Sequence, residues 1–243
     1  MNKLLQDKVA VVTGGSQGLG LAIGTALGID GAKVLLVSRV EEKLKSALAK
    51  IRAHEATADV FVADITLPET AEKIFQAAVS KFGRVDILVN CASIFVWKKF
   101  LELSFDEWRQ TIATNLSAPF FLTQAAAKAL VEQGHGGCVI NITSINGSVG
   151  DPNVVAHCAA KFGLEGLTRA TAEALREFDI RVNAIAPGSI EEDSAERRGE
   201  SPRRKVTQGD IATLVVYLAS DLARSITGAT IHALGSTRTV IKT

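Results

Sequence analysis

Short apolar runs alternate along the chain with longer segments in which apolar residues recur every three or four positions. Apolar runs suited to buried strands occupy residues 8–12, 33–38, 59–63, 85–89, 138–142, 180–185 and 229–233. Helical spacing is found between them, as in 41–52, in the segment from Pro68 to about Gly83, and in 208–218. Strands that alternate with helices in this way predict parallel pairing through right-handed crossovers. We therefore expect a three-layer α/β fold with a doubly wound parallel sheet.

Two further helical patterns follow in the middle of the chain. The first runs from about Leu103 to Leu122 and has the polar Asn115 inside it. A polar residue among so many apolar ones is either a satisfied core amide or part of a site. The second carries His157 and Lys161, which are four residues apart and so share one helical face.

The segment K-V-A-V-V-T-G-G-S-Q-G-L-G, residues 8–20, predicts a strand, a glycine-rich turn and the start of a helix. Glycines let the backbone approach a pyrophosphate, and the N–H groups and positive dipole end of the following helix favour its charge. A tight turn between two core elements would also use glycines. The spacing and context favour a dinucleotide-binding, Rossmann-type domain of 1–243.

Functional residues of such a sheet are expected just after the strands, at their carboxyl ends. Arg39 follows the second strand, where an NAD-binding protein would carry an acidic residue for the ribose hydroxyls. An arginine suits a 2′-phosphate through charge-assisted hydrogen bonds, although it would also serve as a solvated charge at a strand end. This residue favours NADP(H) over NAD(H). After the third strand, Asp64 is placed to accept a hydrogen bond from an adenine amino group.

Composition narrows the class of protein. The 27 basic and 26 acidic residues nearly cancel, which suggests neither a nucleic acid nor an anionic membrane as partner. No apolar run reaches membrane-spanning length, and the first eight residues lack the apolar segment of a signal peptide. The three cysteines show neither metal-ligand spacing nor a disulfide framework, so we expect no metal and a cytoplasmic location.

Residues 191–205 are nearly all polar. Such a stretch predicts a surface connection, and its place beside the carboxyl edge of the sheet predicts a short polar lid loop at about 189–206.

Over nearly its whole length the chain closely resembles the short-chain dehydrogenase/reductase family. The matching blocks, in the family's order, are T-G-G-S-Q-G-L-G (13–20), A-D-I (63–65), N-C-A-S (90–93), Asn115, I-N-I-T-S (140–144), H-C-A-A-K (157–161), P-G (187–188), L-A-S-D (218–221) and I-T-G (226–228). The resemblance implies reversible hydride transfer between a nicotinamide and a carbonyl or alcohol. It also implies a homotetramer or homodimer.

Carried over position by position, the resemblance implies three sets of residues. The catalytic set is Asn115, Ser144, His157 and Lys161. The cofactor-binding set is Gly14, Ser16, Gln17, Gly18, Leu19, Gly20, Arg39, Asp64, Ile65, Asn90, Ala92, Lys161, Pro187, Gly188 and Ile190. The substrate-binding set is Ser93, Phe95 and Ser144, with Ser93 and Phe95 similar to the N-x-A-S-x-F run of pteridine reductases, whose phenylalanine stacks on a planar heterocycle. A core or lid aromatic is the alternative for Phe95.

The main departure from the family is His157, which occupies the place of the tyrosine that exchanges the proton. A histidine can act as acid or base near neutrality, but its ring is shorter than a phenol, and the charge of Lys161 would favour the neutral imidazole. Three alternatives follow: a reductase that uses His157 as proton donor, a reductase that uses Ser144 or bound water, and a protein that binds nucleotide without turnover.

Further departures lie near the end of the chain. Glu192 lies near the place of a threonine that contacts the cofactor, the loop of 187–202 is roughly a dozen residues shorter than is common in the family, and H-A-L-G-S (232–236) replaces an aspartate and two glycines. The sequence thus predicts an NADP(H)-dependent reductase of a carbonyl or planar heterocyclic small molecule. Its alternative is a catalytically impaired, nucleotide-binding regulatory or structural subunit.

Overall fold

This computed structural model describes residues 3–190 and 206–235. Their strands form one parallel sheet in the order β3-β2-β1-β4-β5-β6-β7. The strands are β1 (Val9–Thr13), β2 (Lys33–Ser38), β3 (Ala58–Val62), β4 (Ile87–Asn90), β5 (Gly137–Ile142), β6 (Ile180–Pro187) and β7 (Thr230–Ala233). The chain leaves β1 toward β2 and later returns to β4 on its other side, so strand order reverses between β1 and β4. The predicted doubly wound Rossmann-type fold is confirmed.

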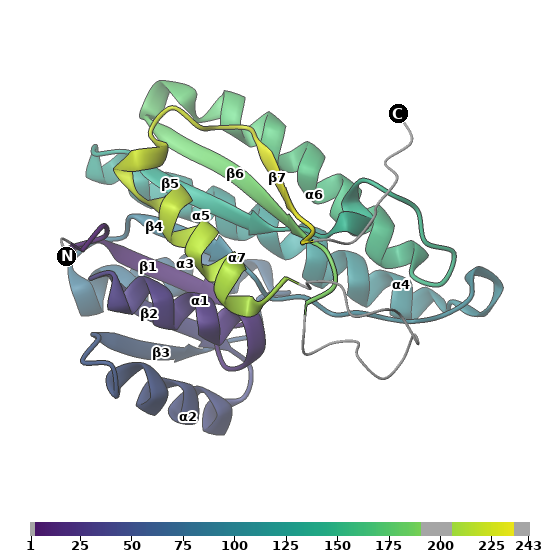
Figure 1. Cartoon of the computed structure of the whole chain (residues 1–243), viewed down its shortest axis with the longest axis horizontal. Helices are drawn as coiled ribbons and strands as arrows, with labels where there is room; N and C mark the ends of the chain where they lie inside the picture. Colours follow the sequence, from purple (N-terminus) through teal and green to yellow (C-terminus); the bar gives the residue numbers. More distant parts are fainter. Residues whose placement is uncertain (1–2, 191–205, 236–243) are drawn as a thin grey trace.

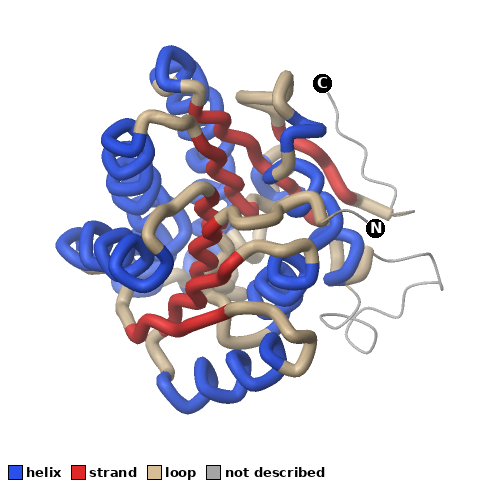
Figure 2. Tube along the Cα trace, turned by 90° about the vertical axis from the view of Figure 1, so that its left-hand side faces the viewer, coloured by secondary structure: helices blue, strands red, loops and turns tan. Residues whose placement is uncertain are grey.

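Helices cover both faces of the sheet, which gives the three layers visible in Figures 1 and 2. One face is covered by α1 (Gly18–Ile29), α2 (Glu41–Arg52) and α7 (Gln208–Ala219). The other is covered by α3 (Pro68–Phe82), α5 (Ala118–Gln133) and α6 (Val155–Ala174), while α4 (Phe105–Ile112) packs on α6. Each face of the sheet thus has its own hydrophobic core.

Successive side chains of the central strands point to opposite faces of the sheet and so contribute to both cores. Ala10 and Val12 of β1 belong to the cluster beneath α1 and α7, whereas Val11 belongs to the cluster beneath α3 and α5. All three are fully buried. A strand covered on both faces needs apolar residues at every position, which explains the continuous apolar runs of the sequence.

The helical pattern of 103–122 is interrupted in the structure. After α4 the backbone widens into a π-helical turn at Ala113–Ser117 before α5 begins. π-Helical turns inside longer helices often lie at functional sites. Here the turn carries Asn115, which is fully buried.

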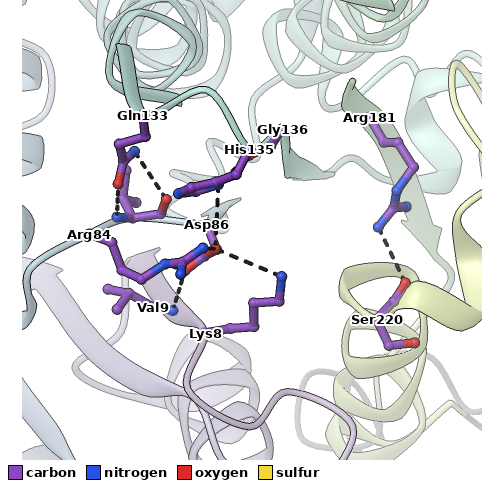
Figure 3. Close-up of polar contacts among 10 residues, drawn as sticks. Lys8, Val9, Arg84, Asp86, Gln133, His135, Gly136, Arg181 and Ser220 are labelled. Atoms are coloured by element: carbon purple, nitrogen blue, oxygen red, sulfur yellow. Dashed lines mark hydrogen bonds and ion pairs between the residues drawn. The ribbon is translucent and has the colours of Figure 1, made fainter. Parts of the chain in front are cut away.

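A buried carboxylate fastens the amino ends of the central strands (Figure 3). Asp86 accepts a hydrogen bond from the backbone N–H of Val9 at 2.8 Å and one from Nε of Arg84 at 2.9 Å. Lys8 lies 3.9 Å away and His135 4.0 Å away, at the rim of the same cluster. The cluster lies at the edge of the sheet opposite to the strand ends that carry the motifs.

Among the described helices, none has both the length and the apolar character needed to cross a bilayer. The predicted lid loop lies mostly outside the described residues, as does Glu192. At its two ends, Ile190 and Val206 form a single parallel bridge.

Candidate active site

A cleft of about 1170 Å³ opens at the carboxyl ends of the strands, where strand order reverses. The structure brings most of the predicted site residues together in its wall. These are Gly14, Ser16, Gln17, Gly18, Leu19, Gly20, Arg39, Asp64, Ile65, Ala92, Ser93, Phe95, Ser144, His157, Lys161, Pro187, Gly188 and Ile190. Two predicted residues, Asn90 and Asn115, lie behind the wall rather than in it.

The glycine turn is built for a close backbone approach. Gly14 has a φ of +68°, and a Cβ on it would lie 2.8 Å from Cα of Ala92. A Cβ on Gly20 would lie 2.2 Å from the carbonyl oxygen of Gly14, so side chains at either place would force the turn apart. Only glycine fits both positions.

The same turn fits the diphosphate of a dinucleotide. It leads into the N-terminus of α1, whose first turn has no acidic residue. A Cβ on Gly18, which lines the cleft, would meet nothing within 4 Å, so a ligand has room beside the free N–H groups. These residues therefore suit the group that the sequence predicts.

One end of the cleft combines a basic side chain with polar groups. Arg39 and Gln17 line the wall there, and Lys43 donates to Oε1 of Gln17 at 2.8 Å. Asp64 accepts from N and Oγ1 of Thr66 at 2.9 and 2.7 Å. The backbone hydrogen bond from Thr66 and, to a smaller extent, the charge of Arg39 lower the pKa of the Asp64 carboxyl, although its partial burial opposes the shift. This end can therefore hold an adenosine and a further negative charge.

The other end holds Ser144 and Lys161. Ser144 follows β5, and its Oγ accepts from the backbone N–H of Asn146 at 3.2 Å. Lys161 is only 3% exposed, and its Nζ donates to the carbonyl of Ile142 at 2.9 Å. Burial lowers the pKa of Lys161 to about 8. The charged ammonium is held at the carboxyl end of β5, two residues before Ser144 in the chain.

His157 lies in the first turn of α6, one helical turn before Lys161. Its residue is 6% exposed, and its ring meets that of Phe95 edge to face, with centroids 4.9 Å apart. Burial first, and then the charge of Lys161, lower the pKa of His157 to about 4, while the carbonyl of Ile94 opposes the shift. The predicted influence of Lys161 on the imidazole is confirmed in direction.

Asn115 has its hydrogen-bonding capacity filled by protein groups. Oδ1 accepts from Oγ of Ser93 at 3.1 Å and from the N–H of Ile94 at 2.9 Å. Nδ2 donates to the carbonyl of Ile94 at 2.8 Å and lies 3.3 Å from Nδ1 of His157. An amide makes four hydrogen bonds at most, so Asn115 is a support for the loop after β4 and for the imidazole.

Asn90 belongs to a buried network between strands and helices. Its Nδ2 contacts Oδ1 of Asn141 at 2.8 Å and Oγ1 of Thr123 at 3.3 Å. Asn141 in turn donates to Thr168 at 2.9 Å. The side chain of Asn90 thus links β4 to β5 and α5 beneath the cleft.

Sequence reasoning missed several residues of the wall. Trp97, Asn146 and Asp151 line the cleft on the side of His157, and Cys91 lies in the wall near Lys161. Lys43 does not line the cleft but contacts the lining residue Gln17. Cys91 and Trp97 lie close to recognised motif residues in the sequence. Asn146 lies in a short 3-10 turn (Ile145–Gly147) and Asp151 in the loop after it, and neither has a periodic signal in the sequence.

The cleft thus contains both the glycine turn and the hydrogen-bond donors of Ser144, His157 and Lys161. Ser144, His157 and Lys161 lie at the end away from Arg39. Such an arrangement can hold a dinucleotide and present polar hydrogens to a substrate oxygen beside it.

Comparison with known proteins agrees with this geometry. The family profile described as short chain dehydrogenase matches residues 8–203. The chain is 37% identical over 244 residues to the L-rhamnose 1-dehydrogenase (NAD(P)(+)) of Azotobacter vinelandii, covering 94% of this chain and 95% of the relative. It is 36% identical over 246 residues to the L-rhamnose-1-dehydrogenase of Scheffersomyces stipitis, covering 94% and 95%. The crystal structure of a short-chain type dehydrogenase/reductase from Mycobacterium marinum superimposes with a TM-score of 0.91 at 29% identity, covering 96% of this chain and 95% of that one.

Proposed function

Because this chain belongs to the short-chain dehydrogenase family and is an NAD(P)-dependent oxidoreductase, we propose that it uses NADP(H) to reduce the carbonyl group of a small or planar heterocyclic molecule. One observation carries the proposal. The glycine turn and the group of Ser144, His157 and Lys161 face a single cleft of a size that holds a dinucleotide and a small substrate together.

The bound nicotinamide supplies the hydride. The residues of this chain act on the substrate oxygen: as the hydride adds to the carbonyl carbon, the π electrons move to the oxygen, which takes up a proton. Ser144 and His157 donate hydrogen bonds to that oxygen, and the charge of Lys161 stabilises the negative charge that develops there. Gly14, Gly18 and Gly20 hold the diphosphate.

The preference for NADP(H) is supported by Arg39 in the cleft wall. Replacing Arg39 by Ala removes a charge-assisted hydrogen bond to the 2′-phosphate, so the Kd for NADPH should rise about 10- to 100-fold while the Kd for NADH stays the same. Lys45→Ala is the matched control, because this exposed lysine of α2 pairs with Glu41 and Glu42 instead. Equal loss of both dinucleotides in Arg39→Ala would contradict the preference.

Two substrate classes are supported by different residues that line the cleft. Phe95 and Trp97, with ring centroids 6.2 Å apart, offer aromatic surface to a planar ring. Asp151 and Asn146 offer hydrogen bonds to a hydroxylated one, and the two relatives above act on L-rhamnose. The panel of substrates should therefore contain pterins, simple ketones and aldehydes, sugar lactones, and L-rhamnose with NADP⁺.

The test of the function is NADPH oxidation over this panel with the wild-type protein and three variants. His157→Phe, Ser144→Ala and Lys161→Ala should each lower kcat by about a hundredfold or more. Arg169→Ala, an exposed change on the same helix α6, should leave it unchanged. Full activity in His157→Phe with losses in the other two would remove His157 from the reaction.

Two alternative outcomes would change the assignment. Tight NADPH binding without turnover of any panel member would identify a nucleotide-binding subunit rather than a reductase. No change in NADPH fluorescence on titration would mean that the cleft does not hold the dinucleotide at all.

We also infer that the chain forms a homodimer or homotetramer. An apolar groove lies on the surface between the start of α5 and α6, outside the cleft. It is lined by Leu116, Ser117, Phe120, Phe121, Gly163, Gly166, Leu167 and Ala170. Large apolar side chains such as Phe120, 41% exposed, and Phe162, 47% exposed, are typical of surfaces that a second subunit covers.

A further inference from the structure

The amide of Asn115 is held in one orientation by the backbone of Ile94. Its Oδ1 accepts from the N–H of Ile94, and its Nδ2 donates to the carbonyl of the same residue. A flipped amide would place an NH₂ group against the N–H and an oxygen against the carbonyl. Nδ2 is therefore fixed as a donor, and its second hydrogen is available to the ring of His157.

That orientation decides the role of one imidazole nitrogen. Nδ1 of His157 lies 3.3 Å from Nδ2 of Asn115 inside the protein. If Nδ1 carried a proton, two N–H groups would face each other in a buried place, which costs free energy. Nδ1 is therefore the acceptor, and the single proton of the neutral ring lies on Nε2.

Three surroundings keep the ring neutral. His157 is the third residue of α6, where the positive end of the helix dipole disfavours a cation. Burial against Phe95 removes water from the ring, and the ammonium of Lys161 adds to this effect, while the carbonyl of Ile94 opposes both to a smaller extent. The pKa of His157, lowered to about 4, agrees with this placement.

The other edge of the ring belongs to the cleft. His157 lines the cleft wall, and its Nδ1 faces the buried amide of Asn115 on the inner side of that wall. We infer that His157 presents Nε2–H to the substrate as a fixed hydrogen-bond donor, and that Asn115 is the positioning residue that sets this tautomer. This inference rests on the proposed function, because it defines how the ring meets the substrate oxygen.

The tautomer defines how the ring acts on the transition state of hydride transfer. A carbonyl oxygen accepts from Nε2–H, and the bond strengthens as negative charge develops on that oxygen. The proton that completes the alcohol then comes from water, which leaves hydroxide. In the reverse direction hydroxide takes the hydroxyl proton of the alcohol, because the lone pair of this ring is at Nδ1, against Asn115, and Nε2–H donates to the alkoxide as the hydride leaves. A neutral histidine that polarises a carbonyl is a known solution in enzymes.

The experiment is a two-bond ¹H–¹⁵N correlation spectrum of the full chain at pH 7, with no cofactor or substrate. The chain has four histidines, and the signals of His157 are assigned as those missing in His157→Gln. We expect a protonated Nε2 and an unprotonated Nδ1. His135, whose Nδ1 lies 3.2 Å from the carbonyl of Gly136, gives an internal contrast with the opposite tautomer. A proton on Nδ1 of His157, or on both nitrogens, would overturn the inference.

A second variant tests the role of Asn115. In Asn115→Asp a carboxylate oxygen replaces Nδ2 and accepts from the ring, so the proton should move to Nδ1 and leave the lone pair of Nε2 in the cleft. Retention of the Nε2–H form in this variant would show that Asn115 does not set the tautomer. Should the buried carboxylate prevent folding, Asn115→Ala removes the donor and should give a mixture of both tautomers; an unmixed Nε2–H form would then count against the role.

Measurements of turnover test whether the tautomer of His157 matters for the reaction. With a substrate of the panel, Asn115→Asp should lower kcat/KM for reduction and for oxidation by the same factor, about a hundredfold, because the ring becomes an acceptor and no longer donates to the transition state that both directions share. An unchanged kcat/KM in a variant whose spectrum shows the proton on Nδ1 would contradict the role of Nε2–H as donor. The spectrum is recorded without substrate, so a wrong tautomer and a wrong assignment as reductase are distinguished.

Discussion

At the scale of single residues, His157 shows how one substitution changes the chemistry of a site whose other parts are kept. The imidazole lies between the ring of Phe95 and the amide of Asn115, one helical turn from Lys161. Burial excludes water from the ring, and the charge of Lys161 adds to it, so both act against the imidazolium. The site therefore contains a cation at Lys161 and a neutral donor at His157, two roles that burial and spacing assign separately.

The same burial predicts how stability depends on pH. The pKa of His157 is about 4 in the folded chain and 6.5 without perturbation, so between these values the unfolded chain binds more protons. The free energy of unfolding should therefore rise as pH increases from about 4 to about 6.5, by up to about 3 kcal/mol from this residue. Urea unfolding at several pH values in that window, compared between wild type and His157→Gln, measures the difference.

The variant should have a flatter pH dependence of stability than the wild type, because glutamine does not titrate. His54→Gln is the matched control, since His54 is exposed and its loss should leave the slope unchanged. Parallel curves for wild type and His157→Gln would contradict the burial of a neutral ring.

At the scale of elements, the sequence predicted those parts whose pattern is set by burial on a sheet. The bounds of β2 and α2 agree with the predicted 33–38 and 41–52, because each has a clear apolar face or run between polar ends. The π-helical turn at Ala113–Ser117 was not predicted, since one extra residue in a turn hardly changes the apolar spacing.

The sequence likewise predicted some parts of the site and not others. Residues just after strands, such as Arg39 and Asp64, could be placed because parallel strands end at one edge. The contacts of His157 with Phe95 and Asn115 could not, because a loop after β4 and a π-helical turn bring together residues 62 and 42 positions apart, and no local pattern encodes their distance.

The cluster around Asp86, at the amino ends of the strands, gives a prediction about β1 and β4 (Figure 3). Asp86→Ala removes the acceptor of the buried N–H of Val9 and the partner of Arg84, so the free energy of unfolding should fall by about 2 to 4 kcal/mol. Lys8→Ala should change it by less than about 1 kcal/mol, because that half-exposed pair is 3.9 Å apart. Urea unfolding measures both, and equal effects would contradict the anchoring role of Asp86.

At the scale of the whole molecule, three surfaces have different tasks. The carboxyl edge of the sheet carries the cleft, and the amino edge carries the Asp86 cluster. The outer side of α5 and α6 carries the apolar groove that we assign to a second copy of the chain. Since α6 also holds His157 and Lys161 on its inner side, covering the groove would hold both faces of the catalytic helix.

This arrangement predicts the effect of a charge in the groove. Phe120→Glu should dissociate the oligomer to a monomer, because burying an unpaired carboxylate in an apolar interface is costly. Val131→Glu is a close control: Val131 is on the same helix α5 and is also 41% exposed, but it lies outside the groove. Sedimentation velocity should give the monomer mass for the first variant and the wild-type mass for the second. An unchanged mass in Phe120→Glu, or equal dissociation in both variants, would show that a different surface joins the subunits.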